Sequence, residues 1–267
     1  KTHIAADLDG MRRLGIDPKS KKGSLIGQGG FEPFTRHDGV HATLKSSANL
    51  AYNSFLRQHG YESENPWQDY ANSVTCPDGT IASGWYLRNS NKPSRVADEH
   101  SETAFITDRA MDFIREQRDH PWCLHLSYIK PHWPYIASAP YHQLFHPDDC
   151  LPAHRLEEER INPHPVYQAF MNNEVSKTFS RDEVRTTVVP TYMGLIKQID
   201  DHLGRLFSFL KTENHMTDTM IVFTSDHGDY LGDHFLGEKE LFHDCAARLP
   251  LILYDPDTSA DATRGTV

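Results

Sequence analysis

Residues 190–227 most restrict how this chain can fold, because a long amphipathic stripe runs into a short β-branched segment. Apolar residues at helical spacing predict a long helix that begins near Pro190 and buries one face. That face comprises Tyr192, Leu195, Ile196, Ile199, Leu203, Leu206 and Leu210. The β-branched residues 219–224, T-M-I-V-F-T, then predict a buried strand.

Other elements extend this pattern to most of the chain. Residues 122–129, W-C-L-H-L-S-Y-I, predict an earlier strand, and residues 249–254 predict a later one. Two further helices are expected, over residues 46–59, where Gly60 would end the helix, and over residues 103–118. The 122–129 strand is joined to the 219–224 strand by a long crossover that contains the helix. This order predicts parallel pairing with a right-handed connection and a helix packed on the sheet.

Polar side chains follow the 219–224 strand at once, with Asp226 and His227 first. Ligands of open α/β sheets bind beyond the carboxyl ends of the strands. A carboxylate oxygen and an imidazole nitrogen are suitable ligands for a divalent cation, and Gly228 and Gly232 would allow tight turns around that point. In the competing interpretation, Asp226 caps a turn and His227 is an ordinary surface residue.

Composition excludes several classes of partner. The chain has 267 residues, 38% of them hydrophobic, and a formal charge of -10. This balance argues against a nucleic-acid groove and against adhesion to an anionic membrane, so an anionic substrate would need a local positive site. The four cysteines are widely separated and contain no C-x-x-C pair, which argues against a zinc knuckle or a disulfide scaffold.

Two loops deserve comparison with functional patterns. Residues 23–30, G-S-L-I-G-Q-G-G, look like a phosphate loop but lack its G-K-[ST] ending and a preceding strand, so a surface loop is predicted. Residues 130–135, K-P-H-W-P-Y, leave the 122–129 strand between two prolines that would stiffen the segment. His132 is therefore a candidate general acid, and the alternative is a loop histidine packed on Trp133.

Several motifs together resemble the sulfatase family of the alkaline-phosphatase superfamily. The segment S-D-H-G-x-x-L-G-D-H contains Asp226 and His227, and Lys239 follows His227 by twelve positions. Lys1 and His3 are similar to the family's K-x-H element, and His132 matches a family histidine before a proline and an aromatic residue. Residues 99–114 look closest to the bacterial arylsulfatase and phosphonate monoester hydrolase branch.

The resemblance implies an alkaline-phosphatase-like α/β/α sandwich with a mostly parallel central sheet. Residues 1–267 would form the central part of one large catalytic domain, with residues 61–100 and 138–165 as cleft-wall or surface excursions. Asp226 and His227 would bind one divalent metal ion, which the family suggests is calcium, with manganese or zinc as alternatives. Lys1 and Lys239 would contact the non-bridging oxygens of the substrate.

His3 and His132 would then serve the leaving group. The family's nucleophile is a formylglycine in a C-x-P-x-R motif, which neither Cys76-Pro77-Asp78 nor residues 91–95 match. It is expected upstream of Lys1, so we expect the chain alone to be catalytically incomplete and to expose apolar sheet surface.

The resemblance implies a small anionic ester as the substrate, and it leaves a homo-oligomer open. Sulfate ester hydrolysis is the first expectation, and hydrolysis of phosphonate monoesters or phosphodiesters is the alternative. A non-catalytic domain that binds anions is the alternative from a different class.

Overall fold

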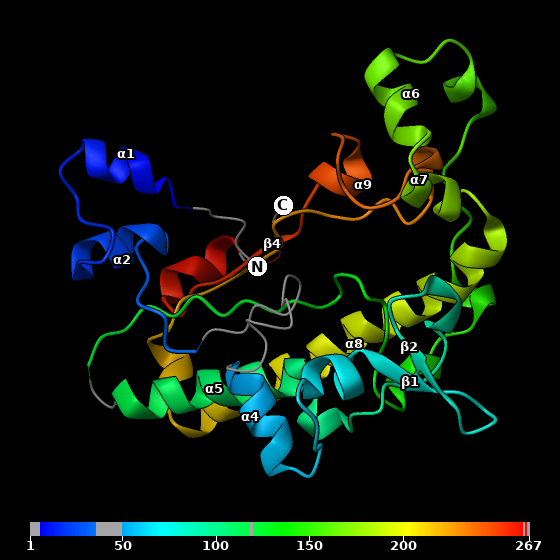
Figure 1. The fold of residues 1–267 in the computed structure, drawn as a ribbon. Helices are drawn as coiled ribbons and strands as arrows, with labels where there is room; N and C mark the ends of the chain where they lie inside the picture. The colour runs from blue at the N-terminus through cyan, green and yellow to red at the C-terminus, as the bar shows by residue number, and fades with distance from the viewer. Residues whose placement is uncertain (1–5, 36–49, 118–119, 264, 266–267) are drawn as a thin grey trace. The chain divides into compact units, whose positions relative to one another are not determined.

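The computed structural model describes residues 6–35, 50–117, 120–263 and 265 (Figure 1). These residues fall into two compact units. The first unit comprises the described parts of residues 1–69 and 99–129, and the second comprises those of residues 70–98 and 130–267. Helices and strands are both present, as an α/β chain requires. Within the described residues, no helix has both the length and the apolar character needed to span a bilayer.

The first unit is built from helices around an aromatic core. Its helices are α1 (Leu8–Arg13), α2 (Lys21–Gly27), α4 (Ala51–Gln58) and α5 (Glu102–Gln117). The rings of Tyr52 on α4 and Phe105 on α5 lie 5.3 Å apart, and both side chains are buried. The helices predicted over residues 46–59 and 103–118 are thus confirmed in their described parts, and Gly60 follows α4 with a φ of 85°.

Two expectations for this unit are wrong. Residues 23–27 belong to α2 instead of a loop, because the Ser20 side chain accepts a hydrogen bond from the Gly23 amide and caps the helix. Residues 121–129 form no strand, since no ladder of backbone hydrogen bonds pairs them with another described segment. An apolar run predicts a strand only where a partner strand is available.

The second unit contains the remaining regular elements. A hairpin of β1 (Ser73–Thr75) and β2 (Ile81–Ser83) comes first, followed by α6 (Pro165–Met171) and α7 (Glu174–Phe179). The long helix α8 (Asp182–Thr212) leads to β3 (Ile221–Thr224), and α9 (Asp244–Ala247) precedes β4 (Leu251–Tyr254).

The long helix begins earlier than expected. Asp182 and Glu183 lie in its first turn, where carboxylates interact favourably with the helix dipole, and Pro190 is inside the helix. Leu195 and Leu210 are buried as expected, but Ile196 is 48% exposed. The helix packs mainly against short 3-10 turns, including residues 87–89 and 141–143, and not against a sheet as predicted.

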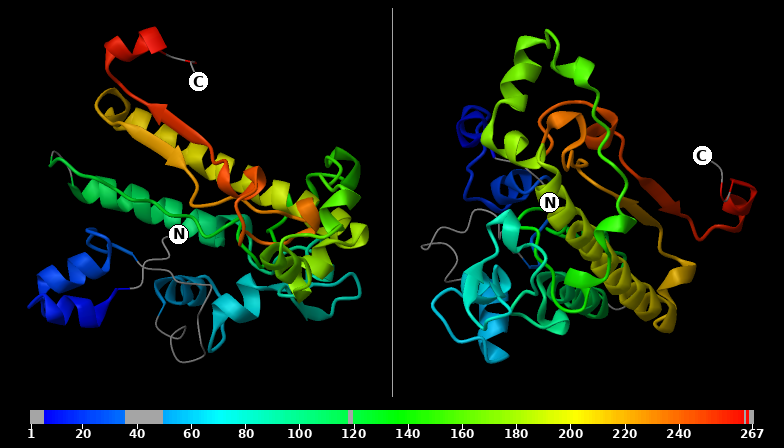
Figure 2. Two further views of the ribbon diagram at one scale, coloured as in Figure 1. Left: turned by 90° about the horizontal axis from the view of Figure 1, so that it is seen from above. Right: turned by 90° about the vertical axis from the view of Figure 1, so that its right-hand side faces the viewer.

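The strands of the second unit differ most from expectation. The predicted strands at 219–224 and 249–254 are present as β3 and β4, but they pair with each other in antiparallel fashion, with Ile221 opposite Tyr254 (Figure 2). No parallel pair occurs among the described strands. Val222 is 56% exposed and Leu253 is 63% exposed, so β3 is not buried. The expected exposure of apolar sheet surface is confirmed.

A buried polar network joins α8 to the segment that precedes the first unit's α5. Gln198 Nε2 donates to Asp98 Oδ1 at 2.7 Å, and His202 Nε2 lies 3.2 Å from the same oxygen. Burial alone would raise the pKa of Asp98, but the hydrogen bonds from His202 and Gln198 outweigh it and lower the pKa. The ionised carboxylate is therefore stabilised in the folded state.

Replacing Asp98 with asparagine should lower the free energy of unfolding by about 1–2 kcal/mol at pH 7. A lowered folded-state pKa contributes stability above the unfolded value of about 3.9, and this contribution is lost as the pH falls through the folded value. Urea unfolding between pH 7 and pH 3 should show that the difference in the free energy of unfolding between the wild type and Asp98→Asn becomes smaller as the pH falls. Glu213→Gln, at an exposed position, is the matched control; a difference constant with pH would contradict the prediction.

Candidate functional site

The candidate site depends on residues 230–238, which we call the return loop because they bring Lys239 back beside the residues after β3. Tyr230 N donates to Glu238 O at 2.8 Å and closes this loop, and Gly232 N donates to Leu236 O at 2.9 Å. The φ angles of Leu231, Gly232, His234, Phe235 and Glu238 are all positive. Only glycine adopts that region without strain, so the surrounding structure must hold the loop in shape.

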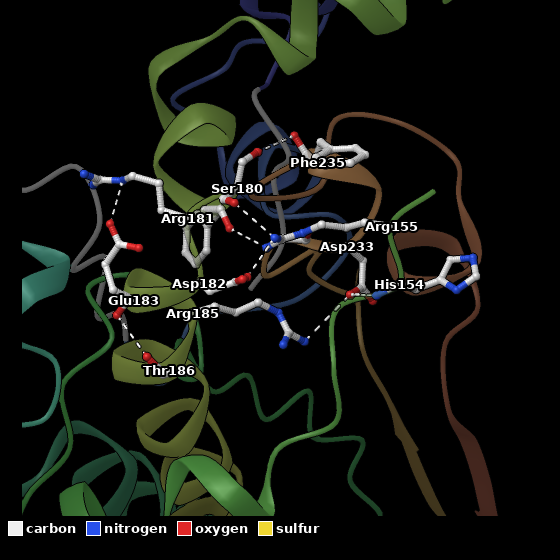
Figure 3. A network of polar contacts seen from close by, with 12 residues as sticks. His154, Arg155, Ser180, Arg181, Asp182, Glu183, Arg185, Thr186, Asp233 and Phe235 are labelled. Atoms are coloured by element: carbon white, nitrogen blue, oxygen red, sulfur yellow. Dashed lines mark hydrogen bonds and ion pairs between the residues drawn. The ribbon is translucent and has the colours of Figure 1, made fainter. Parts of the chain in front are cut away.

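Arg155 provides much of that support (Figure 3). Its Nε donates to Gly232 O at 2.7 Å, and its two Nη atoms donate to Phe179 O and Ser180 O, each at 3.0 Å. Nη1 also donates to Asp182 Oδ1 at 2.9 Å. The side chain is only 13% exposed. One guanidinium therefore ties the return loop to the turn between α7 and α8.

Arg185 holds the same loop from α8. Its Nε donates to Leu231 O at 2.9 Å, its Nη1 donates to Leu151 O at 2.9 Å, and its Nη2 lies 3.8 Å from Asp233 Oδ1. The Asp233 carboxylate also accepts from His154 N at 2.9 Å (Figure 3). Planar guanidinium groups can satisfy several carbonyls at fixed geometry, which lysine cannot do.

The return loop places Lys239 beside His132, although 107 positions separate them. Lys239 Nζ lies 3.5 Å from His132 Nε2. His132 Nδ1 lies 2.7 Å from Trp133 O, and because a carbonyl only accepts, Nδ1 carries a proton. Nε2 is therefore the ring nitrogen that can exchange a proton with a group next to Lys239.

The carboxyl group of Asp229, which is only partly exposed, interacts electrostatically with Lys239. Tyr135 Oη donates to Asp229 Oδ2 at 2.7 Å, and Leu231 N donates to Asp229 Oδ1 at 3.1 Å. Burial raises the pKa of Asp229 to about 6, although these hydrogen bonds and the charge of Lys239 act in the opposite direction. Burial likewise raises the pKa of Glu238, whose carboxylate lies 3.7 Å from Lys239 Nζ. Lys239 thus has acidic neighbours that hold its ammonium group in place.

Asp226 and His227 form the second part of the site. His227 Nε2 lies 3.5 Å from Asp226 Oδ2, and His227 Nδ1 lies 2.8 Å from Gly228 O. Gly228 packs against α9, because a Cβ there would lie 1.9 Å from the Cys245 carbonyl oxygen. Gly228 thus serves close packing, whereas Gly232, with a φ of 98°, provides the expected turn.

This geometry fits two ligands of one cation. Because His227 Nδ1 donates to the Gly228 carbonyl, the neutral ring carries its lone pair on Nε2, which is the form that binds metals. An oxygen and a nitrogen 3.5 Å apart can both reach an ion at about 2.0–2.6 Å. No group of three or more His, Cys, Asp or Glu side chains suited to a metal occurs in the described part of the chain.

The structure brings some predicted site residues together and leaves others outside its description. His132 pairs with Lys239, and Asp226 is next to His227. Lys1 and His3 lie outside the described residues.

The family model named Sulfatase matches residues 26–267 of the chain. The chain belongs to the sulfatase family. It is 36% identical over 232 residues to the multifunctional alkaline phosphatase superfamily protein PehA of Trinickia caryophylli, an alignment that covers 82% of the chain and 44% of that protein. It is 29% identical over 167 residues to choline-sulfatase of Rhizobium meliloti strain 1021, covering 58% of the chain and 31% of that protein.

A solved structure shows the same relationship. The phosphonate monoester hydrolase SpPMH from Silicibacter pomeroyi superposes with a TM-score of 0.73 and 27% identity, covering 91% of this sulfatase-family chain and 47% of that one. The expected fold class, alkaline-phosphatase-like α/β, is confirmed by this similarity. The chain spans less than half the length of these three relatives. Members of the family generally use a divalent metal ion and a formylglycine nucleophile.

Sequence reasoning missed the residues that support the site. Arg155 lies in the 138–165 segment, which was expected to be a cleft wall or surface excursion, and Arg185 lies before the expected start of the long helix. Tyr135 ends the 130–135 segment that contains His132, but the sequence gives no sign of its hydrogen bond to Asp229. An arginine that donates to backbone carbonyls far away in the sequence belongs to no recognisable sequence motif.

Proposed function

We propose that the full-length protein hydrolyses sulfate esters at the site formed by Lys239, His132, Asp226 and His227. The observation that carries this proposal is the 3.5 Å contact between Lys239 Nζ and His132 Nε2 in a member of the sulfatase family. A fixed ammonium group beside an imidazole can stabilise negative charge on a non-bridging oxygen while the imidazole gives a proton to the leaving oxygen.

Each residue has a defined task in this proposal. Lys239, held by its acidic neighbours, binds the anionic head of the ester. His132 keeps its Nδ1 proton on the Trp133 carbonyl and transfers a proton from Nε2 to the leaving group. By resemblance to the family, Lys1 would share the task of Lys239, and His3 would share that of His132.

Asp226 and His227 would hold a divalent cation, calcium by family, with manganese or zinc as alternatives. When bound, such a cation activates a nucleophile and takes up oxyanion charge. By family, the nucleophile would be a formylglycine.

Phosphonate monoester or phosphodiester hydrolysis is the second candidate. The similarity to the phosphonate monoester hydrolase SpPMH favours it, because that structure covers 91% of the chain. Both reactions present a tetrahedral anion to the same lysine and histidine, so these residues alone do not separate them.

Parallel assays of the full-length protein with 4-nitrophenyl sulfate and 4-nitrophenyl phenylphosphonate test the proposal. We expect a higher kcat/KM for the sulfate ester. A higher value for the phosphonate would support the second candidate. Turnover of neither ester by metal-loaded protein would overturn both and favour a non-catalytic domain that binds anions.

A further inference from the structure

A cavity of about 680 Å³ lies within the second unit, next to the candidate site. Its apolar wall includes Trp85, Leu87, Trp133, Tyr135, Phe179 and Val184. These residues come from residues 85–87, residues 133–135, the end of α7 and the first turn of α8. Cavities of this size accommodate small organic molecules.

Two residues that line the cavity are direct sequence neighbours of the lysine–histidine pair. Trp133 follows His132 directly, and Glu238 precedes Lys239, and both of these neighbours line the cavity. An ester with its anionic head at Lys239 would therefore have this cavity beside it for its organic group.

The wall of the cavity is aromatic. Trp85 and Trp133 meet edge to face, with ring centroids 5.1 Å apart and planes at 87°. Tyr135 meets Phe179 in the same way at 6.0 Å. Such walls favour flat apolar groups, which gain edge-to-face or stacking contacts as well as burial.

Three charged residues that line the cavity, Arg88, Arg181 and Glu238, already have partners. Arg181 Nε lies 3.9 Å from Glu183 Oε1, and the Arg88 guanidinium lies 4.6 Å from the centre of the Tyr86 ring. Glu238 lies 3.7 Å from Lys239. This pairing leaves little reason for a charged organic group to prefer the cavity.

We propose that the cavity receives the uncharged aromatic group of the ester, and that Trp85 determines this specificity. The inference rests on the proposed function, because the anionic head must bind at Lys239. Trp85 suits this role since its segment, residues 70–98, carries none of the candidate site residues.

Inert phosphonates that share an anionic head provide the test. Calorimetry would measure the Kd of phenylphosphonate, methylphosphonate and 2-aminoethylphosphonate for the metal-loaded, full-length protein. The wild-type protein should prefer the phenyl probe. Trp85→Ala should raise the Kd of phenylphosphonate about tenfold, as expected for loss of an aromatic contact and its buried area. The same substitution should change the Kd of methylphosphonate by no more than about twofold.

Two further variants keep the test interpretable. Trp85→Phe retains an aromatic ring and should restore most of the phenyl preference, even if Trp85→Ala is poorly folded. Phe207→Ala removes an aromatic residue from α8 that does not line the cavity, and it should change none of the three constants.

Three other results would overturn the inference about the cavity. Equal weakening of the phenyl and methyl probes by Trp85→Ala would place its effect at the anion site and overturn the inference. A wild-type preference for methylphosphonate or 2-aminoethylphosphonate would also overturn it, while the proposed function would stand. Failure of all three probes to bind, together with absence of ester turnover, would reject the proposed function and this inference with it.

Discussion

Replacing Arg155 with alanine should lower the free energy of unfolding by about 2–4 kcal/mol, as expected when several partly buried carbonyls lose a charged donor at once. Three backbone carbonyls, of Phe179, Ser180 and Gly232, would lose a donor at once. Because the return loop contains several residues with positive φ, it should relax when this support is lost. Thermal and urea unfolding of the full-length protein measure the effect.

Two variants show whether stability depends on the several hydrogen bonds that the Arg155 guanidinium donates. Arg155→Lys keeps the charge but cannot reach all these acceptors, so it should restore less than half of the lost stability. Arg248→Ala is the matched control, because that side chain is 84% exposed and pairs only loosely with Asp244 at 3.9 Å; its effect should stay within about 0.5 kcal/mol. A comparable small change for Arg155→Ala would contradict the proposed support of the loop.

Replacing Lys239 with alanine should lower kcat/KM for the ester about 10²–10³-fold, as expected when a group that stabilises developing charge is removed. The free energy of unfolding should change little, because the contacts of Lys239 Nζ with His132 Nε2 at 3.5 Å and with Glu238 at 3.7 Å are too long for strong hydrogen bonds. Initial rates and thermal unfolding of the same preparation measure both quantities.

Lys177→Ala is the matched control for this substitution. Lys177 is a 55% exposed lysine that forms a surface ion pair with Glu174 at 3.7 Å, so its removal should leave both turnover and stability nearly unchanged. A loss of stability for Lys239→Ala in proportion to its loss of activity would instead indicate a structural role.

Local patterns predicted much of the secondary structure. Local residue patterns predict α8 as a helix and β3 and β4 as strands, since helical and strand periodicities differ. Pro190 misplaced the start of α8, because proline is favoured in a first turn but the helix continues through it here. Strand pairing was not predictable, because it depends on partners elsewhere in the chain.

The candidate site residues were taken from sequence motifs and stay predictions. Asp226, His227, His132 and Lys239 lie in motifs that resemble a family, and the contact between Lys239 and His132 agrees with that resemblance. Arg155 and Asp229 were not foreseen, because an arginine in a polar segment and a partly exposed aspartate become distinctive only through distant partners. Their roles follow from hydrogen bonds to Gly232 and Tyr135.

We expect Asp226 and His227 to bind one cation beside the lysine–histidine pair. A crystal structure of the full-length protein grown with calcium, and with manganese for its anomalous signal, would show this ion. The expected result is one ion within about 2.0–2.6 Å of an Asp226 carboxylate oxygen and of His227 Nε2. A well-ordered structure in which these side chains point away from each other, or in which the ion binds elsewhere, would contradict it.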